Sequence, residues 1–220
     1  MTAAAAAAQA LKVFYDTEFI ENGVTIELIS IGMVTEDGRE LYLINSECDW
    51  SKASDWVQEN VISKLEPTPA NFVPHREIRD RVLAFLGWRT RREIAEEEVG
   101  HLLTLDYFKD RDLDAHELLR PAHKLELWGY YSAYDHVALC QLFGTMMNLP
   151  KGMPMYTRDL KQWCVDVGDP KLPEQGKGEH DALADARWNR EAHRFLTDHA
   201  EQQRRARNAH LWSVATGQGE

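Results

Sequence analysis

Two acidic residues of the sequence stand where a carboxylate is costly unless a cation binds it. Asp16 and Glu18 lie inside the apolar segment 12–20, and side chains two apart on a strand point to the same face. Ionised carboxylates in apolar surroundings repel each other, and Lys12 is the only basic residue of this segment. A divalent cation would remove this cost, although a strand end that reaches solvent would also explain the pair.

Two later segments place further groups of this kind at the starts of helices. Asp135 lies where a predicted strand gives way to a helical pattern, among aromatic and small neighbours. His180 and Asp185 follow the glycine-bearing loop 175–179, at the start of another predicted helix. Helix capping, a common role of aspartate, explains either segment taken alone, with Asp181 as the cap of the second.

The combination of these segments favours a metal site. Four carboxylates can hold two divalent ions about 3.5–4 Å apart, the arrangement that promotes in-line displacement at phosphorus. Ligand sets made only of oxygen suit Mg²⁺ or Mn²⁺ better than zinc. The sequence therefore predicts two Mg²⁺ or Mn²⁺ ions as cofactors.

Composition excludes several classes of protein. Among 220 residues, 25 Lys and Arg face 36 Asp and Glu, a net charge of −11. A generally basic nucleic-acid-binding surface is therefore excluded, but an enzyme whose metal ions supply positive charge is not. The three cysteines are far apart, so neither a disulfide framework nor a thiolate zinc site is expected. Because no apolar run approaches about 18 residues, we expect a cytoplasmic protein that binds no membrane.

The elements that would position the acidic residues form an α/β pattern. Residues 12–20, 25–34 and 39–44 are rich in β-branched and aromatic residues and are separated by turn signals, which predicts an antiparallel three-strand meander. The later segments predict a helix from residue 78, a strand over 125–131 and helices over 135–147, 157–167 and 182–196. Strands followed by alternating strand and helix indicate a mixed sheet flanked by helices.

The segments VFYDTEFI, YSAYDHVAL and HDALADA resemble the DEDDh family of 3′–5′ exonucleases, which includes ribonuclease T and oligoribonuclease. YDTEFIENGVTIELISIG and AYDHVALCQLFG are especially similar to the actinobacterial exoribonuclease AS group, which is specific for polyadenylate. The resemblance implies a ribonuclease H-like fold, two metal ions, a single-stranded or overhanging RNA 3′ end as partner, and a homodimer. Many members carry an asparagine four residues before the middle aspartate, where this chain has Tyr131.

The resemblance also implies a role for each residue of the predicted site. Asp16, Glu18, Asp135 and Asp185 would bind the metal ions, and His180 would take the proton from the attacking water. Thr17 and Phe19 are expected to contact the terminal nucleotide. The candidates for phosphate contacts are Arg89, Arg91, Arg92, Arg187, Arg190, Arg194, Arg204, Arg205 and Arg207.

We expect residues 1–11 to form a low-complexity tail and residues 12–200 to form the exonuclease domain. Within it, residues 89–120 would be a helical insertion, and residues 201–220 would form a C-terminal extension. The expected activity is release of nucleoside monophosphates from RNA 3′ ends, with a preference for poly(A). A DNA exonuclease of the same family and an inert nucleic-acid-binding domain remain alternatives. The intact set of five residues argues against the inert domain.

Overall fold

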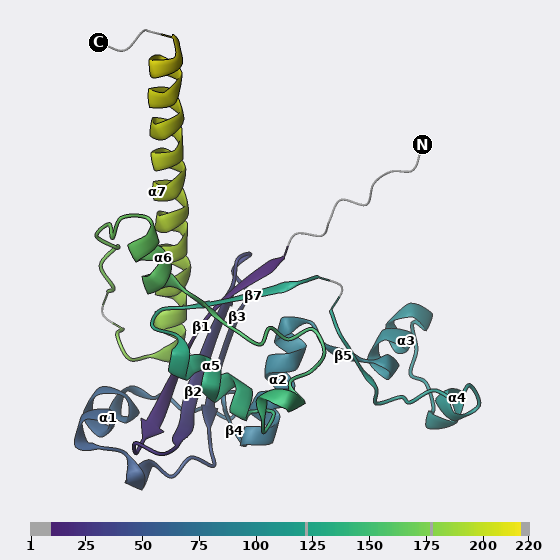
Figure 1. Ribbon diagram of the computed structural model, residues 1–220. Helices are drawn as coiled ribbons and strands as arrows, with labels where there is room; N and C mark the ends of the chain where they lie inside the picture. The colour runs from purple at the N-terminus through teal and green to yellow at the C-terminus, as the bar shows by residue number, and fades with distance from the viewer. Residues whose placement is uncertain (1–9, 122, 177, 217–220) are drawn as a thin grey trace, which may run out of the picture.

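The computed structural model describes residues 10–121, 123–176 and 178–216, which are built around a six-stranded mixed sheet (Figure 1). The strands follow the order β4-β3-β2-β1-β7-β8. Their bounds are β1 (Leu11–Glu21), β2 (Ile26–Thr35), β3 (Glu40–Asn45), β4 (Phe72–Val73), β7 (Leu125–Gly129) and β8 (Arg158–Asp159). β1, β2 and β3 pair antiparallel, whereas β4, β7 and β8 each pair parallel with a neighbour. The predicted mixed sheet and its meander are confirmed.

Helices cover both faces of the sheet, so β1 is buried on both sides. The helices are α2 (His75–Leu86) and α5 (Ala133–Gln141) on one face, and α6 (Leu160–Asp166) and α7 (Ala182–Thr216) on the other. Val13 and Tyr15 of β1 pack in the first layer, whereas Phe14 packs in the second. Alternation along the strand therefore sends Asp16 and Glu18 toward the face of α6 and α7, and Thr17 toward the face of α5.

A glycine on β2 allows α7 to begin against the sheet. Gly32 pairs with Asp16 across the β1–β2 ladder. A Cβ atom at Gly32 would lie 2.2 Å from the backbone oxygen of Ala182, closer than any real contact. The missing side chain thus lets the first turn of α7 lie directly over the strand pair, at the level of Asp16.

Two helices end at other residues than predicted. The helix predicted over 135–147 ends at Gln141, and Gly144 then adopts a left-handed conformation with φ of 91°. The helix predicted over 182–196 continues to Thr216. Its apolar periodicity stops near Leu196, but the following Glu, Gln, Arg and Ala residues have high helix propensity and extend it without a core. In Figure 1 its yellow C-terminal turns project beyond the sheet.

Two further differences concern strands. β7 ends at Gly129, because Tyr131 turns the chain with a positive φ of 54° before α5 begins. The helix predicted over 157–167 begins instead with β8, and the Asp159 carboxylate then caps α6 by accepting hydrogen bonds from two backbone N–H groups.

The predicted insertion is only partly helical. It contains α3 (Arg91–Val99) and α4 (Leu105–Lys109), but a small antiparallel pair of strands, β5 (Arg89–Thr90) and β6 (Leu118–Leu119), closes its base. Leu103, Phe108 and Ala115 form its own apolar cluster. A further short helix, α1 (Asp55–Asn60), follows β3. Within the described ranges, no helix has an apolar stretch long enough to cross a bilayer.

Candidate active site

The acidic residues of β1 face the start of α7. Asp185 lies in the first turn of α7. Ligand atoms of Glu18, His180 and Asp185 all lie within 4.8 Å of one another. Asp16 and Asp135 do not belong to this group, but the charges of Asp135, Glu18 and Asp185 all act on Asp16. The structure therefore gathers all four predicted carboxylates and His180 into one region.

The loop before α7 holds Asp185 from two sides. The backbone N–H of His180 donates a 3.1 Å hydrogen bond to Asp185 Oδ2, and the side-chain amide of Gln175 donates to Oδ1. His180 itself adopts a left-handed φ of 68°. Asp181 caps the helix, as predicted, by accepting a 2.8 Å bond from the N–H of Ala184. Capping thus falls to Asp181, and Asp185 faces Glu18.

The carboxylate of Asp135 is bonded to Thr17 of β1. Its Oδ1 atom accepts a 2.8 Å bond from the Thr17 N–H and a 2.7 Å bond from the Thr17 hydroxyl. The residue that precedes α5 is Ser132, so the capping alternative for Asp135 is wrong. Asp135 and Thr17 are both buried. The backbone N–H and the hydroxyl of Thr17 are therefore both engaged by Asp135.

The electrostatics of the site favour a bound cation. Burial, followed by the charges of Asp185 and Asp135, raises the pKa of Glu18 to about 8. Burial raises the pKa of Asp185 to about 7 and that of Asp16 well above its usual range. Burial also raises the pKa of Asp135 to about 6, against the lowering effect of the two bonds from Thr17. Four carboxylates that resist ionisation together fit hard divalent cations, which prefer oxygen ligands.

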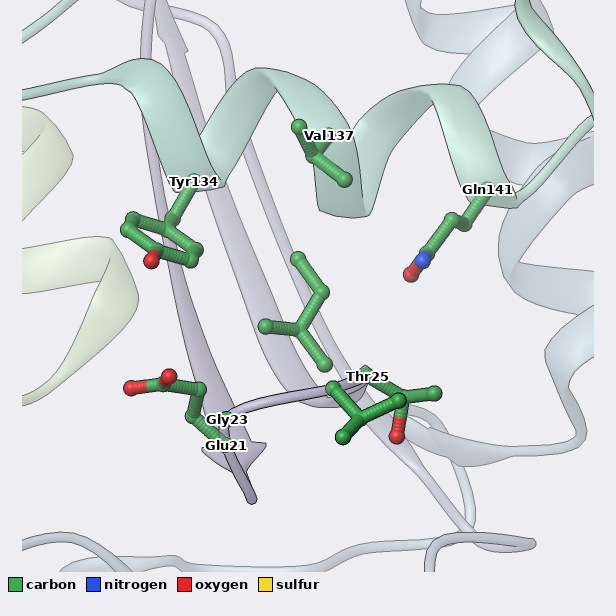
Figure 2. A pocket seen from close by; sticks show the side chains of 8 residues that line it. Glu21, Gly23, Thr25, Tyr134, Val137 and Gln141 are labelled. Carbon is green, nitrogen blue, oxygen red and sulfur yellow. The ribbon is translucent and has the colours of Figure 1, made fainter.

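A small pocket lies beside this region, between the β1–β2 turn and α5. Phe19, the neighbour of Glu18, stacks on the ring of Tyr134 at 5.7 Å between centroids and 22° between planes. The pocket has a volume of about 230 Å³. Figure 2 shows Tyr134, Val137 and Gln141 of α5 pointing toward the turn. The pocket and the stacked pair share Tyr134, the neighbour of Asp135 in the sequence.

Two further residues at the site, both from the stretch after β3, were not predicted from the sequence. The ring of Trp56 makes an edge-to-face contact with His180 at 4.8 Å between centroids. The Lys64 ammonium donates a 3.0 Å bond to the backbone oxygen of Glu179. Its charge lowers the pKa of Glu18, but burial and the neighbouring carboxylates raise this pKa by more. The spacing of residues within 49–65 gave no indication that Trp56 or Lys64 would lie at the site.

Five of the nine arginines expected at phosphates are paired with acids. Arg89, Arg91 and Arg92 of the insertion bond to Glu97, Glu117 and Glu96. Arg187 bonds to Glu40 and Arg205 bonds to Glu201. These arginines are therefore weaker candidates for phosphate contacts than the sequence suggested, and Lys64 is the basic side chain placed next to Glu18.

Residues 11–197 match the family described as the 3′-5′ exoribonuclease Rv2179c-like domain. The chain belongs to this family. The match begins with β1 and ends in α7, so the family domain spans the whole sheet and every residue of the site. The antiparallel meander followed by the parallel strands β7 and β8 agrees with the predicted mixed sheet flanked by helices.

Members of the Rv2179c-like family occur in Mycobacterium tuberculosis. The chain is 42% identical over 189 residues to the 3′-5′ exoribonuclease Rv2179c of strain H37Rv, covering 85% of this chain and 94% of that protein. The same figures hold for the 3′-5′ exoribonuclease MT2234.1 of strain CDC 1551.

Solved structures with a similar outline include a 3′-exonuclease that recognises the histone mRNA stem-loop (TM-score 0.47, 12% identity, 87% of this chain and 65% of that chain). Exonuclease I is another (TM-score 0.47, 12% identity, 83% of this chain and 39% of that chain).

Proposed function

We propose that this chain is a metal-dependent 3′–5′ exoribonuclease of the DEDDh type that releases nucleoside monophosphates from RNA 3′ ends. The proposal depends on one observation: Glu18 of β1, His180 of the loop before α7 and Asp185 of α7 lie close together. Their ligand atoms are within 4.8 Å of one another. Membership of the exoribonuclease family supports the same chemistry. An inert binding domain would have no use for buried carboxylates that raise one another's pKa.

Asp16, Glu18, Asp135 and Asp185 would hold two Mg²⁺ or Mn²⁺ ions. When bound, the ions supply an activated water and stabilise the charge that develops on the leaving 3′ oxygen. His180 would accept the proton of that water. The edge-to-face contact with Trp56 orients the imidazole, and the bond from the backbone N–H of His180 to Asp185 holds the loop that carries it.

The pocket between the β1–β2 turn and α5 would take the base of the terminal nucleotide. Phe19 and Tyr134 offer stacked aromatic rings beside Glu18 and Asp135. Stacking of a base on an aromatic side chain contributes about 1–3 kcal/mol and tolerates any base. The stacked pair would therefore support binding of any base at the 3′ end. The proposed partner is a single-stranded or overhanging RNA 3′ end in the cytoplasm, bound by a homodimer.

Digestion of 5′-labelled oligonucleotides tests this function. With Mg²⁺, we expect stepwise shortening of RNA from the 3′ end, release of monophosphates, and no activity with EDTA. Following the resemblance to the exoribonuclease AS group, we expect oligo(A) to be shortened faster than oligo(U) or oligo(C). Equal rates on the three oligonucleotides would refute the adenine preference but not the proposed exoribonuclease activity. Faster digestion of DNA than of RNA of the same sequence would favour the DNA exonuclease instead.

A further inference from the structure

We propose that Thr17 is a positioning residue that holds Asp135 in place as a metal ligand, through its hydroxyl as well as its backbone. This inference rests on the metal site of the proposed exoribonuclease. It differs from the expectation that Thr17 contacts the RNA, because the atoms that would make such a contact are already bonded within the protein.

The two bonds join β1 and α5, which also share the apolar cluster that contains Val13, Tyr15, Ala138 and Leu139. Thr17 lies on the α5 face of β1, between two residues that face α7. Asp135 stands in the first turn of α5, 118 residues further along the chain. The distances of 2.8 and 2.7 Å are those of charge-assisted bonds. Residue 17 thus ties the strand that carries Asp16 and Glu18 to the helix that carries Asp135.

Both bonds reach the same carboxylate oxygen. Oδ1 of Asp135 accepts the N–H and the hydroxyl, which leaves Oδ2 as the atom for a cation. Any residue at position 17 except proline would supply the N–H, but only threonine or serine supplies the hydroxyl at this length. Groups that orient a metal ligand in this way typically change metal affinity or activity about 10- to 100-fold when they are removed.

The decisive variants are Thr17→Val, which keeps the shape and removes the hydroxyl, and Thr17→Ser, which keeps the hydroxyl. Binding of Mn²⁺ should be measured by calorimetry on the RNA-free protein. We expect Thr17→Val to weaken Mn²⁺ binding about tenfold or more and Thr17→Ser to stay close to wild type. Thr197→Val is the matched control, because its hydroxyl bonds to the His193 backbone oxygen at 2.8 Å, away from the site.

Kinetics separate positioning from contact with RNA. With saturating metal, we expect Thr17→Val to lower kcat and to leave KM for RNA unchanged. A raised KM together with unchanged Mn²⁺ affinity would overturn the proposal and restore Thr17 as a substrate contact. In an Asp135→Asn background, Thr17→Val should cause no further loss of Mn²⁺ binding; an additive loss would show that Thr17 does not act through Asp135.

The role of Thr17 can also be tested if Thr17→Val fails to fold or if the wild-type protein cleaves no RNA. If Thr17→Val fails to fold, Thr17→Ala is compared with Thr17→Ser; both lack the methyl group, and only the alanine lacks the hydroxyl. Equal Mn²⁺ affinities for these two variants would then contradict the proposal. A wild-type protein that cleaves no RNA would refute the proposed function, whereas the calorimetric comparison would still support or overturn the role of Thr17.

Discussion

Gly32 on β2 lies directly opposite Asp16 on β1, and the space where its side chain would be is filled by the backbone of Ala182. The carboxylate of Asp16, a proposed metal ligand, and the start of α7 are therefore brought to the same level of the sheet by a residue without a side chain. The position of Asp185, one turn into α7, depends on this close approach.

Gly32→Ala should consequently damage both stability and the site. The added Cβ would lie 2.2 Å from a backbone oxygen, so α7 must shift away from β2. Overpacking of this kind costs about 1–3 kcal/mol, which urea unfolding would measure. Mn²⁺ affinity should fall in parallel, since Asp185 moves with the helix. Gly176→Ala, where a Cβ meets nothing within 4 Å, is the control, and a Gly32→Ala protein of wild-type stability would contradict the close packing.

Asp16→Ala should abolish RNA cleavage and weaken metal binding, because a charged ligand is lost from a site that needs several. In EDTA the same variant should melt at a higher temperature than wild type, since burial and four neighbouring carboxylates disfavour the Asp16 charge. Thermal melts would measure both effects: relative to wild type, the melting temperature of the variant should be higher in EDTA and lower with Mg²⁺. Near-normal turnover of Asp16→Ala with Mg²⁺ would refute the two-metal assignment.

The raised pKa of Glu18 makes the metal-free protein sensitive to alkaline pH. Burial raises this pKa from 4.5 to about 8, so the folded state binds a proton near pH 7 that the unfolded state does not. Stability must then fall as the pH rises through 8, by about 1 kcal/mol between pH 7 and 9 from Glu18 alone. Asp16, whose pKa is also raised by burial, adds to this loss.

Urea unfolding in EDTA at pH 7, 8 and 9 would measure the slope, and saturating Mg²⁺ should remove it. Stability should be measured above pH 7 because His193 also affects it at lower pH. Burial lowers the pKa of His193 to about 4. That group makes stability rise with pH below about 6.5, where the unfolded imidazole is protonated. A metal-free stability that is constant from pH 7 to 9 would contradict the raised pKa of Glu18.

His180→Ala should separate proton transfer from metal binding. Removal of a general base typically costs about 10²–10⁴-fold in rate, and we expect this loss with both metal ions still bound. His180 also lies within 4.8 Å of two carboxylates, so calorimetry with Mn²⁺ is needed. Loss of metal as complete as in Asp16→Ala would make His180 a ligand instead.

The sequence predicted those features that depend on local periodicity. Alternation along one strand was enough to place Asp16 and Glu18 on a common face, and the cap at Asp181 followed from its position. The partner of Asp135 could not be predicted, because the Thr17 contact joins a strand and a helix whose residues lie 118 positions apart in the sequence. Lys64 and Trp56 belong to a stretch of short helical turns whose packing against the loop before α7 has no counterpart in sequence spacing.

The projecting end of α7 changes how the protein moves through solution. Beyond Gln203, whose amide still bonds to the Val167 backbone oxygen, the helix continues to Thr216 with an exposed surface along residues 204–212. Thirteen residues at 1.5 Å each make a rod of about 20 Å. Such a rod increases frictional drag without adding much mass, so even a monomer would elute early from a gel-filtration column. The number of subunits must therefore be determined by light scattering or sedimentation equilibrium, which report mass rather than shape.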